Sequence, residues 1–314
     1  MQRARNWERM EKSDAPGSEQ QRTDRLKAIA LTLLAVTMFA CLDGTAKYLV
    51  SVELLPVGQI VWMRFFGHLL LVAVVLGFVS IPRLLRTHKL KYQLARSLLM
   101  LSATLLNVIA LRYLRLDQTT TILFLAPLTV ALLAGPTLGE WVGWRRLVAI
   151  LVGFMGILIA IRPGISAVHP AFLLCLGGML SYSLYILMTR YLAAHDTSEV
   201  TLFYSTVVGT IFAAPWALSE WVWPTGPLGW ILLLSLGFWG GASHYVFIVA
   251  HRWAPTSALA PFLYGQLLAA TAIGYFVFDQ LPDVWTITGA GIIVASGIYM
   301  LHRERIVKRE DVED

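Results

Sequence analysis

Four side chains that can carry charge lie inside two neighbouring apolar stretches of this sequence. Asp43 and Lys47 fall in one stretch, and Arg64 and His68 fall in the next. Ionisable groups are costly in an apolar environment, so each is expected to have a function or a partner. In helices, Lys47 is one turn from Asp43, and His68 is one turn from Arg64. The group holds a surplus positive charge that could bind a carboxylate or phosphate, with a histidine that titrates near neutral pH.

The same four residues also allow a structural interpretation. Asp43 and Arg64 could neutralise each other as a buried pair, while Lys47 extends to the nearer interface. Counting about 1.5 Å per residue from the ends of their stretches places Asp43 and Arg64 at the same depth, roughly 10 Å from one boundary. The two can therefore meet under either interpretation, and Arg64 is the first choice for a substrate contact.

A second set of candidates is polar rather than charged and lies in the second half of the chain. Its members carry hydroxyl, imidazole or amide groups that could line a central cavity for a small organic molecule. They are Tyr182, Tyr185, Tyr204, Ser243, His244, Tyr245, Tyr264 and Gln266. Ordinary helix packing or an interfacial position is the alternative for each tyrosine. A hydrogen-bonded core histidine is the alternative for His244.

The composition indicates where these side chains must be held. Of the 314 residues, 57% are hydrophobic and only 14% are charged, and the mean hydropathy is +0.66. So few charges cannot cover the surface of a water-soluble domain. The two cysteines, Cys41 and Cys175, lie in apolar runs without histidine or cysteine at zinc spacing. We therefore expect no disulfide framework, no metal and no cofactor.

Ten apolar stretches follow one another along the chain. Most have the roughly 17 to 25 residues that a helix needs to cross a bilayer, and none alternates as a membrane strand would. They run at about Leu26 to Leu49, Val57 to Val79, Leu94 to Leu111, Thr119 to Leu138, Leu147 to Ile161, Pro170 to Met188, Val200 to Leu218, Leu228 to Ala250, Ser257 to Phe278 and Val284 to Leu301. The predicted fold is an all-α integral membrane protein with ten transmembrane helices. Pro127, Pro215 and Pro261 predict kinks in three of them.

The basic residues are distributed very unevenly over the connecting segments. Twenty of the 25 Lys and Arg residues fall in segments on one side, Arg96 among them, and only Arg112, Arg115 and Arg162 fall in those on the other. This asymmetry predicts a bacterial inner-membrane protein with both termini in the cytoplasm. The excess of positive charge is thereby assigned to topology and anionic lipid, so no nucleic-acid partner is expected.

The two halves of the sequence resemble each other at an offset near 141 residues. The triplet KYL at 47–49 recurs as RYL at 190–192, and Trp144 recurs as Trp285. Each half would contain five helices, and because five is odd the second half must enter the membrane inverted. Inverted repeats are typical of secondary transporters.

The expected organisation has four parts. Residues 1–25 form a cytoplasmic tail, 26–162 the first five-helix repeat, 163–303 the second repeat, and 304–314 a second cytoplasmic tail. The membrane part resembles a known family in several segments: LDGTAKYL, VWMRFFGHLL, the LGE that ends the fourth stretch, RLVAILVGFMGILIAIRPG, APFLYGQ and FDQLPDVWTITGAGIIVASGIYMLHRER.

On these segments the chain resembles the drug/metabolite transporter superfamily and, more narrowly, the ten-helix EamA-type permeases of bacteria. The resemblance implies two five-helix repeats and alternating-access transport of a small metabolite, without enzymatic activity. Members of the family carry amino acids, riboflavin, S-adenosylmethionine, metallophores and other metabolites. The membrane lipid and the substrate are the expected partners, and a homodimer is left open.

The sequence allows three functions. The first is a secondary transporter of a small polar metabolite, amino-acid-like or otherwise carboxylate-bearing. The second is an uptake carrier for a vitamin- or S-adenosylmethionine-like metabolite, with proton coupling left open. A more distant third is an intramembrane lipid-modifying enzyme. The sequence contains no phosphate-binding loop, HExxH or GxSxG motif, so ATP-driven transport and the common hydrolases are not expected.

The topology can be tested with reporter fusions. Fusions placed after Ser51, Arg115, Glu220 and Asp283 should all report the outer side of the membrane, because the basic residues retain the other loops in the cytoplasm. Paired reporters that are active only inside or only outside provide the measurement. A cytoplasmic signal at any two positions would contradict the predicted topology.

Overall fold

Helices make up all regular secondary structure in the part of the chain that the structure describes. The structure is a computed structural model, and it describes residues 15–77, 81–139, 143–161, 169–253, 259 and 262–313. The helices are α2 (Ala15–Ser51), α3 (Val57–Leu76), α4 (Ile81–Leu84), α5 (Leu90–Leu111), α6 (Leu116–Leu123), α7 (Ala126–Leu138), α8 (Trp144–Ile161), α9 (Ala171–Leu192), α10 (Ser198–Ser219), α11 (Pro227–Trp253), α13 (Gly265–Phe278) and α14 (Val284–Glu313).

Seven helical segments of the described residues are long and apolar enough to cross a membrane. They are Thr23–Ser51, Val57–Val75, Leu90–Leu111, Leu116–Thr137, Ala171–Leu192, Ser198–Ser219 and Pro227–Ala250. Three shorter apolar helices are Leu147–Ala160, Gly265–Phe278 and Val284–Met300. The all-α, multi-pass membrane class expected from the sequence is confirmed. The total of ten membrane crossings stays a prediction.

The fourth predicted helix is two helices. The chain turns at Phe124 and Leu125, and Pro127 is the second residue of α7. Proline has no N–H to donate, and the first turn of a helix does not need that donor. Pro215 lies inside α10 as expected, whereas Pro261 lies outside the described residues.

Two of the predicted helix boundaries differ markedly from the structure. The expected tail before Leu26 is helical from Ala15, and α14 continues through Glu313 beyond its apolar part. Glu, Gln, Lys and Arg are good helix formers, and a helix satisfies its own backbone groups in water as well as in lipid. Hydropathy therefore locates the membrane-embedded part of a helix without marking where the helix ends.

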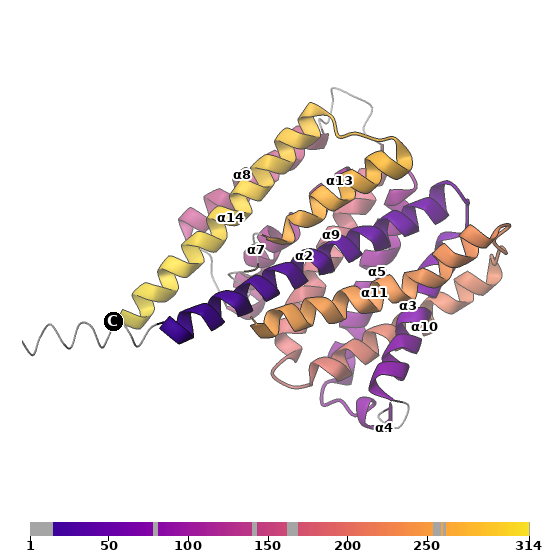
Figure 1. The fold of residues 1–314 in the computed structure, drawn as a ribbon, viewed down its shortest axis with the longest axis horizontal. Helices are drawn as coiled ribbons and strands as arrows, with labels where there is room; N and C mark the ends of the chain where they lie inside the picture. Colours follow the sequence, from indigo (N-terminus) through magenta and orange to yellow (C-terminus); the bar gives the residue numbers. More distant parts are fainter. Residues whose placement is uncertain are drawn as a thin grey trace, which may run out of the picture.

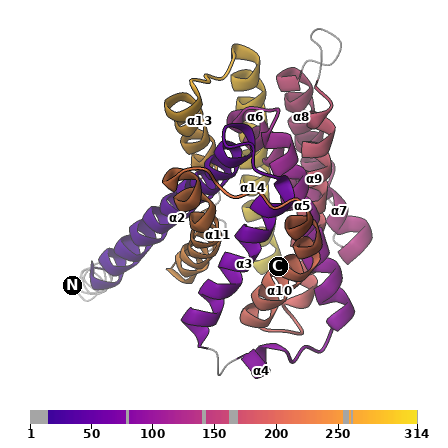
Figure 2. The ribbon, with the colours of Figure 1, turned by 90° about the vertical axis from the view of Figure 1, so that its right-hand side faces the viewer.

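The helices pack in a few extensive pairs. α2 packs along α11, α5 along α9, α3 along α10 and α11, and α8 along α14. Figure 1 shows α8 and α14 together at one edge of the bundle, and the start of α2 and the end of α14 at the same end of the molecule. Both views place α4 at the lower end of the bundle (Figures 1 and 2); we call this the α4 end.

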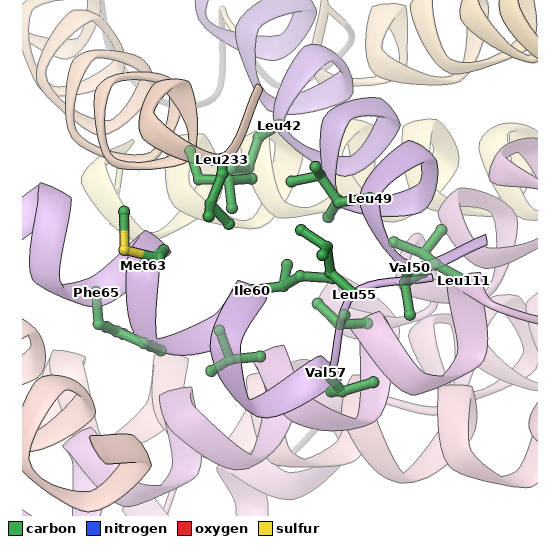
Figure 3. Close-up of a cluster of buried hydrophobic side chains, with 14 of the residues drawn as sticks. Leu42, Leu49, Val50, Leu55, Val57, Ile60, Met63, Phe65, Leu111 and Leu233 are labelled. Atoms are coloured by element: carbon green, nitrogen blue, oxygen red, sulfur yellow. The ribbon is translucent and has the colours of Figure 1, made fainter. Parts of the chain in front are cut away.

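The interior contains two large apolar clusters. One joins α2, α3, α5 and α11, whose leucine, valine and phenylalanine side chains point into a shared interior (Figure 3). The other joins α6, α7, α8, α9 and α14. Tyr185 packs against the first cluster and Tyr182 against the second. The polar residues of α9 therefore lie where the two clusters meet.

Two glycines bring α3 and α11 together. A Cβ on Gly67 would lie 2.8 Å from the Cα of Gly237, and a Cβ on Gly237 would overlap the backbone of Gly67. Only glycine permits such a close backbone contact. The crossing lies within one turn of Arg64 and His68 on α3 and of Gly240 on α11. It therefore fixes how these side chains meet.

A polar network at the α4 end ties the loop before α10 to the start of α5. The Asp196 carboxylate accepts hydrogen bonds from the hydroxyl of Thr87, the backbone N–H of His88 and Nε2 of Gln93, the last at 2.9 Å. Burial of this carboxyl opposes its ionisation, but the three hydrogen bonds outweigh that effect, so the pKa of Asp196 is lowered from its ordinary value. The network therefore stabilises the fold only while Asp196 is ionised.

The glycine crossing predicts a position-specific loss of stability. Gly237→Val should lower the free energy of unfolding by about 1–3 kcal/mol, because two backbones must separate to admit the side chain. Thermal unfolding in detergent measures the effect. Gly291→Ala on α14 is the matched control, since a Cβ there meets no atom within 4 Å. Equal melting temperatures for the two variants would contradict the assigned contact.

The Asp196 network predicts a pH-dependent contribution to stability. At pH 7, Asp196→Asn should lower the free energy of unfolding by about 1 kcal/mol, because a charged acceptor is lost. A lowered pKa means that this contribution is full above the unfolded-state value of about 3.9 and is lost as the pH falls below it. Unfolding measured between pH 7 and pH 3 should show the two proteins converging. Glu199→Gln, an exposed neighbour on α10, should match the wild type throughout, and a constant gap for Asp196→Asn would refute the assignment.

Candidate functional site

Arg64 lies in the middle of α3 and crosses the face of α11. The point that a Cβ would occupy on Gly240 is 3.7 Å from Cγ and 3.9 Å from Nε of Arg64. Although it is deep in the bundle, the side chain is only half-buried. Among the described residues, its guanidinium makes no hydrogen bond and no ion pair within 4 Å. Its donors are thus free to bind a ligand.

Asp43 supplies the negative charge nearest to Arg64. The two interact electrostatically, as Arg64 also does with Tyr182 and Tyr185. The Oδ1 atom of Asp43 accepts a hydrogen bond of 3.2 Å from Nδ2 of Asn107 on α5. Asp43 and Arg64 therefore interact as expected, but at a distance longer than an ion pair.

Two histidines form a stack beside Arg64. The rings of His68 on α3 and His244 on α11 are parallel within 10°, with centroids 5.9 Å apart. Phe39 of α2 packs edge-on against His244 at 4.9 Å. Both histidines interact electrostatically with Arg64. Two helices thus place imidazole rings near one guanidinium, and a third helix packs a phenyl ring against one of them.

The opposite side of the group is formed by α9. Tyr182 and Tyr185 are one turn apart, and their rings stack with centroids 5.7 Å apart. The Tyr185 hydroxyl accepts a hydrogen bond of 2.8 Å from Nη2 of Arg96. Because both tyrosines also interact with Arg64, the structure joins these candidates from the second half to those from the first.

Arg96 is a buried arginine that the sequence analysis assigned to a loop. It lies in α5 and is only 3% exposed. Nε donates to the Thr189 hydroxyl at 2.7 Å, and Nη1 donates to the Ser205 hydroxyl at 2.7 Å and to the Thr201 carbonyl at 3.0 Å. Among the described residues its partners are neutral, so a full positive charge remains close to Tyr185.

A signal for Arg96 was present in the sequence. The residue is the third of the predicted stretch from Leu94, and Gln93, Ser97 and Met100 fall beside it on one helical face. All four are buried in α5. Hydropathy and the positive-inside count favoured a loop because they score one residue at a time. The surrounding polar stripe indicated a buried face instead.

Lys47 is placed apart from Arg64. Its ammonium group donates to the carbonyls of Leu111 at 3.1 Å and Leu114 at 2.7 Å, and it lies 5.2 Å from the centre of the Phe278 ring. These carbonyls belong to the end of α5, where a cation offsets the partial negative charge of the helix terminus. Lys47 therefore caps a helix, and its charged neighbours are Asp117 and Arg115 rather than the other members of the predicted charge cluster.

Among the described residues, three further candidates are not in the set of groups that interact with Arg64. Tyr204 donates its hydroxyl to the Leu85 carbonyl at 2.9 Å, at the α4 end. Tyr264 packs edge-on against Phe124, with centroids 5.0 Å apart. Gln266 is half-buried on α13 and has no hydrogen bond to another described residue. Of the remaining two, Ser243 bonds within α11 and Tyr245 is 61% exposed.

The group that the structure brings together is called the central site below. Four helices contribute to it. It contains a cation, a carboxylate and aromatic rings, a combination that can hold an organic molecule reversibly. Its members are Asp43, Arg64, His68, Tyr182, Tyr185 and His244. Among the described residues no group of three or more His, Cys, Asp or Glu side chains is arranged to hold a metal ion.

Known proteins resemble this chain over most of its length. A riboflavin transporter of Vibrio cholerae is 28% identical over 281 residues, which is 89% of this chain and 94% of that protein. An S-adenosylmethionine uptake transporter of Rickettsia bellii is 26% identical and spans 87% and 92% of the two chains. The pseudopaline exporter CntI of Pseudomonas aeruginosa is 22% identical over 88% and 96%.

A solved structure and a family model give the remaining comparisons. A crystal structure with 16% sequence identity has a TM-score of 0.61 and covers 88% of this chain and 97% of its own, so the two share a fold. The model of the EamA-like transporter family matches residues 26–162 and again residues 169–302. These two matches cover most of the sequence. The chain therefore belongs to the EamA-like transporter family and is a multi-pass membrane transporter.

Proposed function

We propose that this protein takes up a small metabolite with a planar heteroaromatic ring, of the vitamin or S-adenosylmethionine type, across the bacterial inner membrane. The relatives named as riboflavin and S-adenosylmethionine uptake transporters support this reading over an amino-acid-like carboxylate. Their identities of 28% and 26% support the class of compound without selecting one. Movement of the substrate is proposed to proceed by alternating access.

The composition of the central site is the observation that carries the proposal. The Tyr182–Tyr185 and His68–His244 stacks present aromatic faces on which a flat ring can pack. Arg64 and Asp43 lie beside them without pairing at ion-pair distance, so one can bind an acceptor of the substrate and the other a donor. A ring with polar edges or a zwitterionic tail uses all of these groups, whereas a simple carboxylate uses only Arg64.

The helix contacts support two inverted repeats. Suppose that the five helices of the first half correspond in order to the five of the second half: α2, α3, α5, α7 and α8 to α9, α10, α11, α13 and α14. Exchanging the two halves then turns the pair of α2 and α11 into the pair of α9 and α5. Both pairs pack extensively, as do the equivalent pairs α3 with α11 and α10 with α5. The same exchange leaves two other extensive pairs unchanged, namely α3 with α10 and α8 with α14. This exchange is what a twofold relation between halves would produce.

Polar contacts between the proposed halves exist at both ends of the bundle. At the α4 end, Gln93 of the first half binds Asp196 of the second. At the other end, Gln59 donates to the Val222 carbonyl at 2.8 Å and accepts from its N–H at 3.1 Å. Contacts of this kind can open and close in turn, as alternating access requires. The start of α2 and the end of α14 at one end of the molecule (Figure 1) support a cytoplasmic location for both.

Transport by purified protein in liposomes tests the proposal. Labelled riboflavin and S-adenosylmethionine are compared with glutamate, and one of the two ring compounds should be carried at a rate at least tenfold above that of glutamate. Arg64→Gln should lower this rate tenfold or more, because a hydrogen bond from a charged donor is worth about 1.5–3 kcal/mol. Arg64→Lys should be intermediate, since a planar fork becomes a point charge.

Two controls separate binding from folding. Arg112→Gln removes an exposed arginine at the end of α5 and should leave the rate unchanged. The double variant Asp43→Asn with Arg64→Gln should be as inactive as Arg64→Gln alone. A double variant with the wild-type rate would assign Arg64 a purely structural role. Transport of glutamate in preference to both ring compounds would restore the carboxylate carrier as the better reading.

A further inference from the structure

A groove runs along the outward face of the α8 and α14 pair, away from the central site. Its volume is about 530 Å³, within the range of pockets that hold an organic ligand. Val148 and Val152 of α8 form one wall, and Ile292 and Ala295 of α14 form the other. Figure 1 shows that this helix pair is the edge of the bundle. The groove therefore opens on the surroundings of the protein.

The floor of the groove is rigidly closed. A Cβ on Gly156 of α8 would lie 2.9 Å from the carbonyl oxygen of Gly289 on α14, so the two backbones touch. Two turns along, the hydroxyl of Ser296 donates to the carbonyl of Ala149. Because the helices are joined at two levels, the groove is a fixed depression in the surface.

One end of the groove is polar and positively charged. Trp144 and Arg145 of α8 line it together with Tyr299 of α14. The Arg145 guanidinium lies 5.7 Å from the Trp144 ring centre, and the residue is exposed. Among the described residues, no acidic side chain lines the groove and Arg145 makes no ion pair. The end of the groove thus presents donors and a positive charge, while its length is apolar.

We propose that this groove binds an anionic phospholipid of the surrounding membrane. The phosphate is held by Arg145, with the Tyr299 hydroxyl and the Trp144 indole N–H as neighbouring donors, and an acyl chain lies between Val148, Val152 and Ala295. Tryptophan, tyrosine and arginine are the side chains that anchor helices at the level of lipid headgroups, and basic pockets between membrane helices bind acidic lipids.

The charge and the setting favour a lipid over other occupants. The flank of α8 next to the groove exposes Leu147, Leu151 and Met155, which suits contact with acyl chains better than it suits a site for a water-soluble anion. A second copy related by a twofold axis along the membrane normal would bring its own Arg145 into the same leaflet. Two unpaired arginines would then face each other, which is unfavourable.

Native mass spectrometry of the detergent-purified chain tests the proposal. The protein is exchanged against phosphatidylglycerol or phosphatidylcholine with identical acyl chains. Wild type should retain one phosphatidylglycerol per chain and hold it at least tenfold more strongly than phosphatidylcholine. Arg145→Gln should abolish that preference and Arg145→Lys should keep it, because the charge selects the headgroup. Ala295→Trp should lower retention of both lipids, because the indole fills the groove.

The control variant is Arg86→Gln, which removes an exposed arginine of the α4 end and should bind lipid like the wild type. Size-exclusion profiles identify any variant that fails to fold. Retention of phosphatidylglycerol by Arg145→Gln at the wild-type level would overturn the proposal. A lipid-free dimer of the wild type would overturn it in favour of a second copy, and equal thermal stabilisation by inorganic phosphate alone would overturn it in favour of a soluble anion.

Discussion

A hydrocarbon layer offers no hydrogen-bond partner to a peptide group or to a charge, and this constraint governs the whole structure. It makes each membrane segment a helix, since only a helix satisfies its own backbone. It also favours internal polar side chains that find a hydrogen-bond partner elsewhere in the bundle. Three side chains show how this is met. Lys47 binds carbonyls at and just after the end of α5, and Gln59 binds the backbone of Val222. Arg96 binds three hydroxyls and a carbonyl.

The two internal arginines illustrate how the constraint separates structure from function. Arg96 uses all of its nitrogen atoms on neutral partners and is closed to further ligands. Arg64 on α3 has no such partners among the described residues and keeps exposed surface. Leaving a charge unsatisfied inside a bundle costs stability, so a site that keeps one gains something else. Binding of a substrate with complementary polar groups is the use that fits the aromatic stacks beside it.

At the outer surface of the bundle the requirement is reversed, because side chains that face hydrocarbon must be apolar. α8 and α14 make little contact with the central helices and pack on each other, with Gly156 against Gly289 as the closest approach. Their outward face is apolar, with Leu151, Met155 and Ile287 exposed, as suits a protein in a hydrocarbon layer. An apolar cluster that includes residues of α6 and α7 connects this edge to α9.

The sequence by itself determined the class of fold, because apolar runs of membrane length are a local property. It also predicted a group of Asp43, Lys47, Arg64 and His68, since depth along two adjacent helices can be counted, and the structure separates only Lys47 from the others. It could not place Tyr182, Tyr185 and His244 beside them. Those contacts depend on which helix of one half packs on which helix of the other, and glycine contacts such as Gly67 with Gly237 set that pairing.

Partners of single polar side chains were likewise decided only by the tertiary structure. Lys47 and Tyr204 looked like site residues because their types and depths were suitable, yet carbonyls of other segments bind both. Arg96 looked like a loop residue, yet α9 and α10 enclose it. A hydrogen bond acts over about 3 Å, so which groups form one is fixed by the packing of whole helices and is absent from any local pattern of residues.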